Sequence, residues 1–371
     1  MKTSNSKTKA FAFWGAAFML LAALMFTGCK QSAGGSGSGI GGTVHEAPFV
    51  EGGASLILSP DKLDIKVKAV TSDGNPIVIE GCNETELAND TETELHATGT
   101  TVILKGKIIE LYCGAYKYNG TYNNIQNKLT ALNVQGLNAL QVLSCSANQL
   151  TALDVQGLTA LRRLECNGNQ LTALDVQGLT VLKELYYIGN QLTALNVQGL
   201  TALQKLECHG NNHLTAFNAQ GCTALKELEC GGMQLTSLNV QGCTSLERLW
   251  CGGHQLTDLN VQGCTSLQQL ICYNSQLIVL NVQGLTALKG LACYGNRLNA
   301  DAFKKLFDDL PQRDAGDNAS CTLYTEEPGV TEGNHTDFTA PPDLAAAFNN
   351  AKTVKKWKMY KRKINGPGEE I

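Results

Sequence analysis

A near-identical segment of 21 residues recurs through the middle of the chain, and this repeat constrains the fold more than any other feature. Successive copies begin at Leu140, Leu161, Leu182, Leu203, Leu225, Leu246, Leu267 and Leu288. The copy that contains Asn212 and His213 is one residue longer, and a degenerate copy from Ile108 carries an insertion between Cys113 and Leu129. Self-similarity at a fixed period of this length predicts a solenoid, in which each repeat packs on its neighbours.

Each repeat begins with a short strand. In the copy from Leu161, Leu164 and Cys166 alternate with polar residues, as in a strand with one buried face. Equivalent strands stack as a parallel sheet with about 4.8 Å between neighbours, and L-x-x-L-x-L/C-x-x-N-x-L is the leucine-rich-repeat pattern. The predicted fold is an α/β-type leucine-rich-repeat solenoid, mostly β, with a right-handed superhelix and a parallel concave sheet.

Polar residues end the strands. An asparagine whose amide can bond the backbone of neighbouring turns occupies one column: Asn148, Asn169, Asn190, Asn211 and Asn296. Three repeats carry another residue there, namely Met233, His254 and Ser275, so looser packing is expected in those middle repeats. The second half of a repeat is too short for a full helix, so extended or 3₁₀ segments are expected, with Gly178 and its equivalents permitting the turn.

The chain has 14 cysteines, and most of them occupy two repeat positions. The first column is Cys113, Cys145, Cys166, Cys208, Cys230, Cys251, Cys272 and Cys293; the second is Cys222, Cys243 and Cys264. Sister repeats fill the second position with Leu158 or Leu179, so these cysteines behave as small buried hydrophobes. Stacked free thiols are favoured over disulfides, and no C-x-x-C pair supports a metal site. Cys82 and Cys321 are either free or paired.

The first thirty residues have the composition of an export signal. Lys2, Lys7 and Lys9 precede an apolar run over 11–26 that is short for a membrane span, which needs about 20 residues. The following Phe-Thr-Gly-Cys29 resembles a bacterial lipobox, so residues 1–28 are predicted to be a lipoprotein signal peptide and Cys29 the lipidated residue. An ordinary signal peptide or anchor is the alternative. Residues 29–45, rich in Gly and Ser, form a flexible tether.

The repeats and their flanks together resemble bacterial surface leucine-rich-repeat lipoproteins, whose repeats are internalin-like. Strand patterns at 61–67, 77–81 and 101–106 are similar to the β-rich N-terminal cap of that group, assigned to 46–107. Residues 108–300 hold nine repeats, the first with the insertion and the last partial. A helix pattern near 297–311 and strand patterns at 321–324 and 357–360 are similar to its α/β C-terminal cap, assigned with a basic tail to 301–371.

Side chains between the buried strand positions point to the concave face, and these are the candidate ligand-binding residues: Arg163, Glu165, Tyr186, Glu207, Glu229, Trp250, Ile271, Tyr273 and Tyr294. The last four lie on adjacent strands and are predicted to form one exposed aromatic and apolar patch, a typical contact surface. Packing against the C-terminal cap is the alternative for this patch. The charged candidates compensate one another, which favours a solvated face.

Composition and motifs exclude several functions. The formal net charge of −4 and the pI of about 5.9 are not those of a polyanion binder, so no nucleic acid partner is expected. The sequence shows no catalytic constellation, so an enzyme, a cofactor and a metal are not expected. Calcium at Asp154 and Asp175 is less favoured than a turn role, because Asn196 and Asn218 share their column. The basic tail over 352–363 has the alternation of a capping strand, with an acidic polysaccharide or anionic membrane as the alternative.

The resemblance implies the ligand class. It predicts an exported protein, lipid-anchored to the outer membrane or cell surface, that binds a protein or glycan on a host cell, the matrix or another bacterium. The membrane contact would be made through the N-terminal lipid. The alternative is a periplasmic or envelope interaction scaffold without a host ligand.

Overall fold

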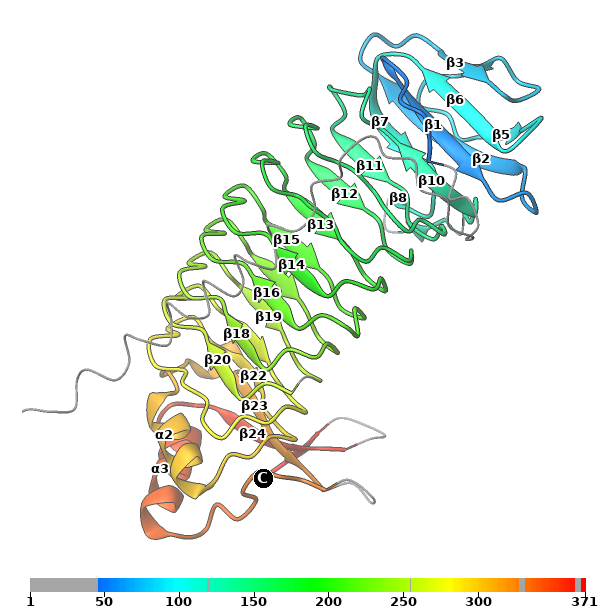
Figure 1. The fold of residues 1–371 in the computed structure, drawn as a ribbon. Coiled ribbons are helices and arrows are strands. Elements are labelled where there is room, and N and C mark those ends of the chain that lie inside the picture. The colour runs from blue at the N-terminus through cyan, green and yellow to red at the C-terminus, as the bar shows by residue number, and fades with distance from the viewer. Residues whose placement is uncertain (1–45, 119–120, 124, 254, 327–330, 364–367) are drawn as a thin grey trace, which may run out of the picture. The chain divides into compact units, whose positions relative to one another are not determined.

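The computed structural model describes residues 46–118, 121–123, 125–253, 255–326, 331–363 and 368–371. The apolar run, Cys29 and most of the tether lie outside these residues. The segment His45–Ile371 is one compact unit. Its repeats form a mostly-β leucine-rich-repeat solenoid, which confirms the predicted fold class (Figure 1).

A parallel sheet, formed by one short strand from each repeat, holds the described repeats together. Its members are β7 (Ile108–Tyr112), β11 (Val142–Ser144), β12 (Arg163–Glu165), β13 (Glu184–Tyr186), β15 (Lys205–Glu207), β17 (Glu227–Glu229), β19 (Arg248–Trp250), β21 (Gln269–Ile271) and β22 (Gly290–Ala292). Equivalent residues pair across neighbouring strands, for example Glu165 with Tyr186 and Glu229 with Trp250. The 21-residue period therefore sets the register of the whole sheet.

Cap strands extend this sheet at both ends, to fourteen strands among the described residues. At the N-terminal end β2 (Asp64–Thr71) pairs antiparallel with β7 and with β5 (Thr93–His96). At the C-terminal end β23 (Ser320–Thr325) and β24 (Lys358–Arg362) continue the parallel order, and β25 (Glu369–Glu370) pairs antiparallel with β24. The terminal repeats are thus covered, as expected, since an open repeat would expose its core and a strand edge.

The second half of each repeat is extended. Parallel pairs form there between β14 (Ala194–Asn196) and β16 (Ala216–Asn218), and between β18 (Ser237–Asn239) and β20 (Asp258–Asn260). The Asp175 carboxylate accepts a hydrogen bond from the Gln177 backbone N–H at 3.0 Å, and Gly178 takes a φ of +84°. Both the turn role of the aspartate column and the need for glycine are confirmed.

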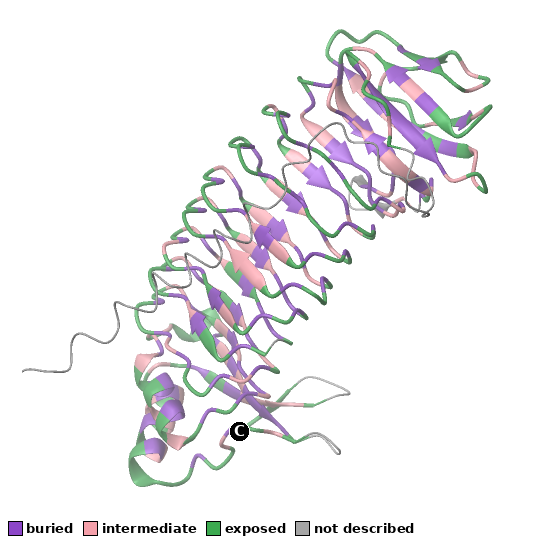
Figure 2. Ribbon diagram, in the orientation of Figure 1, coloured by how far each residue is buried: buried purple, intermediate pink, exposed green. Residues whose placement is uncertain are grey.

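Leucine and cysteine columns fill the core, and Figure 2 shows buried residues alternating with exposed ones along the turns. All the cysteines in the described residues are free, and all but Cys82 are buried. Burial raises the pKa of the Cys113 thiol to about 12. In the second column the Cys222 and Cys264 thiols donate to the Val197 and Val240 carbonyls, at 3.1 and 3.3 Å. The buried-thiol reading is confirmed, and Cys321 is free.

The asparagine column forms a ladder of buried amides. Asn169 accepts from the Leu150 N–H at 3.0 Å and donates to the carbonyls of Cys145 and Cys166 at 3.1 and 3.2 Å. Each side chain therefore joins two successive turns. Ser275, in the same column, donates at 3.5 Å to Tyr273 of its own turn. His254 lies outside the described residues.

The N-terminal cap is an antiparallel sheet of order β10-β1-β6-β3-β4. Its strands are β1 (Gly53–Leu58), β3 (Ile77–Glu80), β4 (Glu86–Leu87), β6 (Thr101–Lys105) and β10 (Leu129–Asn133). The insertion in the first repeat contains a hairpin of β8 (Lys117–Tyr118) and β9 (Thr121–Tyr122). Just before this hairpin Ala115 makes a bridge to Ser146, so the insertion folds back over the start of the repeats.

The C-terminal cap contains α2 (Ala300–Asp309), α3 (Pro342–Thr353) and the 3₁₀ helix η1 (Ala315–Asp317). Asn299 caps α2 by accepting from the Ala302 N–H at 2.9 Å. The buried Trp357 indole donates to the Pro311 carbonyl at 2.8 Å. Lys361 of the basic tail pairs with Glu326 at 2.7 Å, as in a capping strand. No helix in the described ranges is long and apolar enough to cross a membrane.

Candidate functional site

The outward-pointing side chains of β12 to β21 form one continuous surface, which we call the outer sheet face. Its columns run across neighbouring strands. They comprise Arg163, Glu184, Lys205, Glu227, Arg248 and Gln269; Glu165, Tyr186, Glu207, Glu229, Trp250 and Ile271; and, just past the strands, Asn167, Ile188, His209, Gly231, Gly252 and Tyr273. Eight of the nine predicted binding residues belong to this face. Only Tyr294, one turn further on, falls in the cap contact described below.

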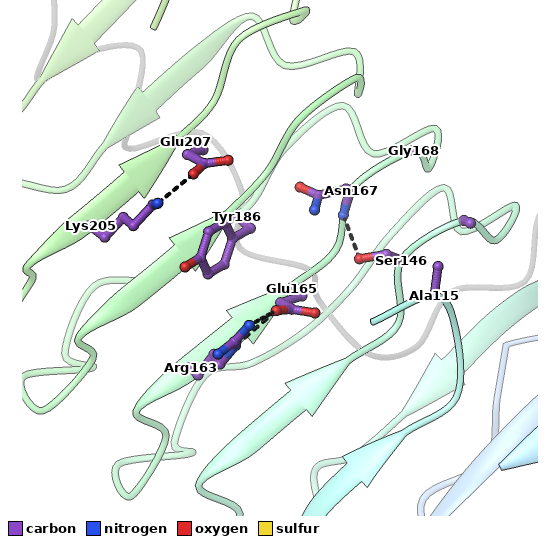
Figure 3. A pocket seen from close by; sticks show the side chains of 10 residues that line it. Ala115, Ser146, Arg163, Glu165, Asn167, Gly168, Tyr186, Lys205 and Glu207 are labelled. Atoms are coloured by element: carbon purple, nitrogen blue, oxygen red, sulfur yellow. Dashed lines mark hydrogen bonds and ion pairs between the residues drawn. The ribbon is translucent and has the colours of Figure 1, made fainter. Parts of the chain in front are cut away.

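A pocket of about 220 Å³ opens at the N-terminal end of the outer sheet face. Figure 3 shows its lining: Ala115, Ser146, Ala147, Arg163, Glu165, Asn167, Gly168, Tyr186, Lys205 and Glu207. Four predicted candidates thus meet in one hollow. Ala115 from the insertion supplies a wall, which a regular repeat would lack.

Ion pairs neutralise most of the charge in this pocket. Arg163 pairs with Glu165 and, at 3.3 Å, with Glu184, while Lys205 pairs with Glu207 at 2.8 Å and Glu227 at 3.0 Å. Burial opposes the charge of Lys205, but the hydrogen bonds that it donates to the Glu207 and Glu227 carboxylates outweigh that cost and raise the pKa of the amine. The charged candidates therefore form ion pairs with one another, as the sequence predicted.

Tyr186 lies between two of these cations. The Arg163 guanidinium is 5.3 Å from the ring centre and the Lys205 amine is 5.7 Å from it. The Tyr186 hydroxyl also donates to Glu184 at 3.0 Å. The chain thus surrounds a guanidinium with carboxylates and an aromatic face by using its own residues, a favourable arrangement for a cation.

Glu165 departs from the expectation of a solvated face. It is 5% exposed, because the Ser144 hydroxyl donates to one carboxylate oxygen at 3.0 Å and Arg163 covers the other. The Glu165 carboxylate is buried and accepts hydrogen bonds at both oxygens. It therefore stabilises the pocket and is not open to a ligand.

The aromatic patch is smaller than predicted. Trp250 is 39% exposed, and Ile271 and Tyr273 are partly exposed on the outer sheet face. Tyr294 is 8% exposed, since its ring stacks on Tyr273 at 4.8 Å and the Arg362 guanidinium lies over it at 4.8 Å. Tyr294 therefore packs against the C-terminal cap, which was the alternative for this patch. Trp250 remains exposed, with Ile271 and Tyr273 partly exposed beside it.

His209, Gly231 and Gly252 are functional candidates that the sequence reasoning did not single out. The His209 ring lies 6.2 Å from Trp250, and its Nδ1 is 3.9 Å from Glu229. A methyl group on Gly252 would lie 3.1 Å from Tyr273, so glycine lets the ring lie over the backbone. The sequence did carry a signal for this arrangement: the two repeats before Tyr273 have glycine, Gly231 and Gly252, at the equivalent position.

The described residues contain no group of three or more His, Cys, Asp or Glu that could hold a metal ion. What the outer sheet face offers is contact: one ion-paired pocket, one set of exposed aromatic and apolar side chains, and the carboxylates between them.

The chain matches no known protein-family model and no curated protein. Among solved structures it is similar to the functional domain of InlJ from Listeria monocytogenes, described as including a cysteine ladder, with 26% identity and a TM-score of 0.45. That alignment covers 62% of this chain and 51% of the other. The leucine-rich-repeat protein LIC12759 of Leptospira interrogans follows at 23% identity and 0.42, with 65% of each chain covered.

An internalin, InlF of Listeria monocytogenes, has 19% identity and a TM-score of 0.26, with 64% of this chain and 84% of that chain covered. The chain spans less than two thirds of the length of both InlJ and LIC12759. All three TM-scores lie below 0.5, so the assignment of a leucine-rich-repeat solenoid rests on the repeat and strand register of the chain itself.

Proposed function

We propose that this chain is a non-catalytic binding protein that holds a protein or glycan partner against the outer sheet face. The observation that carries the proposal is the exposed ring of Trp250 beside the partly exposed Ile271 and Tyr273, on neighbouring turns of a largely ion-paired surface. Exposed aromatic side chains on a rigid sheet lose little entropy on binding and are common anchors. A regular solenoid offers a long surface of this kind.

The proposal includes the setting of the protein. A lipid on Cys29 would anchor the chain to the outer membrane or cell surface, and the Gly/Ser-rich tether would hold the solenoid away from the lipid. The partner would lie on a host cell, in the matrix or on another bacterium. The sequence of the signal and tether supports this part, and these residues lie outside the described ones.

Binding of residues 30–371 to epithelial cells and immobilised matrix proteins tests the function. Saturable binding should fall at least about tenfold in a Trp250→Ala, Tyr273→Ala double variant, since each aromatic anchor contributes about 1 kcal/mol or more. Ile278→Ala, Val279→Ala is the matched control, because these apolar residues are 62% and 54% exposed and lie outside the outer sheet face. Equal loss in both variants would contradict the assigned surface.

Protease treatment of intact cells tests the setting separately. Cleavage without breaking the envelope is expected for a surface protein. Protection until the envelope is opened would instead favour a periplasmic interaction scaffold and remove the adhesive role.

A further inference from the structure

The outer sheet face from β12 to β19 carries more negative charge than its own cations balance. Arg163, Lys205 and Arg248 face five carboxylates there: Glu165, Glu184, Glu207, Glu227 and Glu229. Glu227 takes two of the cations, Lys205 at 3.0 Å and Arg248 at 3.4 Å. Because Glu227 takes two cations, the uncompensated negative charge lies at the carboxylates beside it.

Glu229 is the least compensated of these carboxylates. Its ionic partner in the described chain is His209, 3.9 Å away, and that pair exists only when the imidazole is protonated. Burial, followed by repulsion from Glu207, raises the pKa of Glu229. A cation placed beside Glu229 would relieve this repulsion.

Trp250 stands directly beside Glu229. The two residues pair across β17 and β19, and Glu207 pairs with Glu229 across β15 and β17, so the three Cα atoms follow one another at about 4.8 Å. No Lys or Arg of the described chain lies over the Trp250 ring, which is 39% exposed. Gly231, in the next column, adds no side chain to cover the site.

The outer sheet face contains one place where an aromatic ring and carboxylates already bind a cation. At its N-terminal end Arg163 lies over the Tyr186 ring with Glu165 and Glu184 as ion-pair partners. The centre repeats the carboxylates and the aromatic ring, and has the His209 imidazole where the other end has a guanidinium: the imidazole lies 6.2 Å from Trp250 and 3.9 Å from Glu229. A guanidinium is planar, weakly hydrated and able to bond two carboxylates, so it suits this place better than an ammonium.

We infer that Glu229 and Trp250, beside a Glu207 that is ion-paired to Lys205, form a subsite for a basic side chain of a protein partner, with arginine preferred to lysine. The inference rests on the proposed binding function and specifies its chemistry. It makes the partner a protein that presents an exposed arginine, next to apolar residues that would contact Ile271 and Tyr273.

Fluorine NMR of residues 30–371 labelled with 5-fluorotryptophan tests the subsite. That segment contains all of the compact unit and two tryptophans, Trp250 and the buried Trp357, which serves as an internal control. Three blocked tripeptides, Gly-X-Gly with arginine, lysine or citrulline at the centre, are titrated in turn. Citrulline keeps the shape of arginine and removes its charge.

The arginine peptide should shift the Trp250 signal saturably and leave Trp357 in place. Lysine should bind more weakly, citrulline should give no saturable shift, and Glu229→Gln should weaken arginine binding by about fivefold. Glu94→Gln, on an exposed strand of the N-terminal cap, should leave binding unchanged. An equal response to citrulline, or unchanged affinity in Glu229→Gln, overturns the inference.

Failure of the subsite is distinguishable from failure of the proposed function. If the arginine peptide does not act on Trp250 while cells or matrix proteins still bind through Trp250 and Tyr273, the binding function stands and the partner chemistry is wrong. If the peptide binds and no cell or matrix ligand does, the subsite stands and the adhesive role is withdrawn.

Discussion

Two stretches of the same solenoid connect their turns in different ways. From β11 to β15 a buried asparagine amide joins each turn to the next, as Asn169 does. From β17 to β21 the asparagine is replaced, and thiols of the second cysteine column bond to the preceding turn, as Cys243 does to the Ala219 carbonyl at 3.6 Å. An S–H group is a weak donor, so a thiol bond such as that of Cys243 is weaker than the amide bonds that Asn169 makes between turns.

The second stretch also carries the exposed and partly exposed aromatic and apolar residues of the outer sheet face. Trp250, Ile271 and Tyr273 all belong to turns without the asparagine. Two departures from the repeat thus occur in the same turns: the replaced asparagine inside the core, and the aromatic and apolar residues on the outer sheet face. The comparison shows that the turns that lack the asparagine also carry Trp250, the exposed aromatic side chain of the outer sheet face.

The largest expected effect comes from removing one rung of the asparagine ladder. Asn169→Ala leaves the buried Leu150 N–H without an acceptor, which costs about 1–3 kcal/mol. It also removes one of the two amide donors from each of the Cys145 and Cys166 carbonyls, which keep their bonds from Asn148 and Asn190. We expect a loss of about 3 kcal/mol in urea unfolding. Ser275→Ala, whose side chain bonds within its own turn, should cost below about 1 kcal/mol. Equal costs would remove the distinction between the two stretches.

A smaller effect is expected from the thiol column. Cys243→Ala removes a buried sulfur and its bond to Ala219, which together should cost about 1–2 kcal/mol. Thr244→Ala, at the exposed neighbouring position, provides the control and should change stability little. Thermal unfolding followed by circular dichroism measures both. A Cys243→Ala protein as stable as the control would show that these thiols only fill space.

Restoring the ladder should have a smaller effect of opposite sign. Ser275→Asn places an amide in the column occupied by Asn169 and Asn296 and should stabilise the protein by about 1 kcal/mol in urea. Amide hydrogen exchange in β19 and β21 should slow at the same time. Faster exchange would mean that the later turns have diverged too far to accept the amide.

Contacts between adjacent repeats could be predicted from the sequence, whereas contacts between a repeat and a cap could not. Strand register, the Asn169 bonds, the glycine turns and the buried thiols follow from the period, because each involves equivalent residues of adjacent repeats. Packing of Tyr294 against the C-terminal cap was one of two alternatives that the sequence left open, since the residue that covers it, Arg362, comes from β24. Glu165 was misassigned because its own neighbours Ser144 and Arg163 enclose it. Contacts between a repeat and a cap carry no periodic signal.

The smallest expected effect lies outside both stretches, in the N-terminal cap, and provides a reference for them. The Glu84 carboxylate accepts a hydrogen bond from His96 at 2.7 Å, which lowers the pKa of Glu84 to about 2 and raises the pKa of His96. The stabilisation is present between these values. It is lost as pH rises through the folded value of His96, or falls through that of Glu84.

An NMR titration of His96 measures this pair. In Glu84→Gln the pKa of His96 should return toward about 6.5, the value of an unperturbed histidine. The urea midpoints of the asparagine variants should not depend on pH in the same range. A pH-dependent difference between them would link the cap to the ladder, which the comparison of the two stretches does not anticipate.

The row of free cysteines has a consequence for how this chain is made. Thiols on adjacent strands sit about 4.8 Å apart at the backbone, within the span of a disulfide. While the chain is unfolded in any oxidising compartment, each thiol can cross-link to many wrong partners. Once folded, burial keeps them protonated and away from oxidants, as the raised pKa of Cys113 reflects. In such a compartment the repeats must therefore pack faster than their thiols are oxidised. The free thiols of the folded solenoid are the state that this order of events produces.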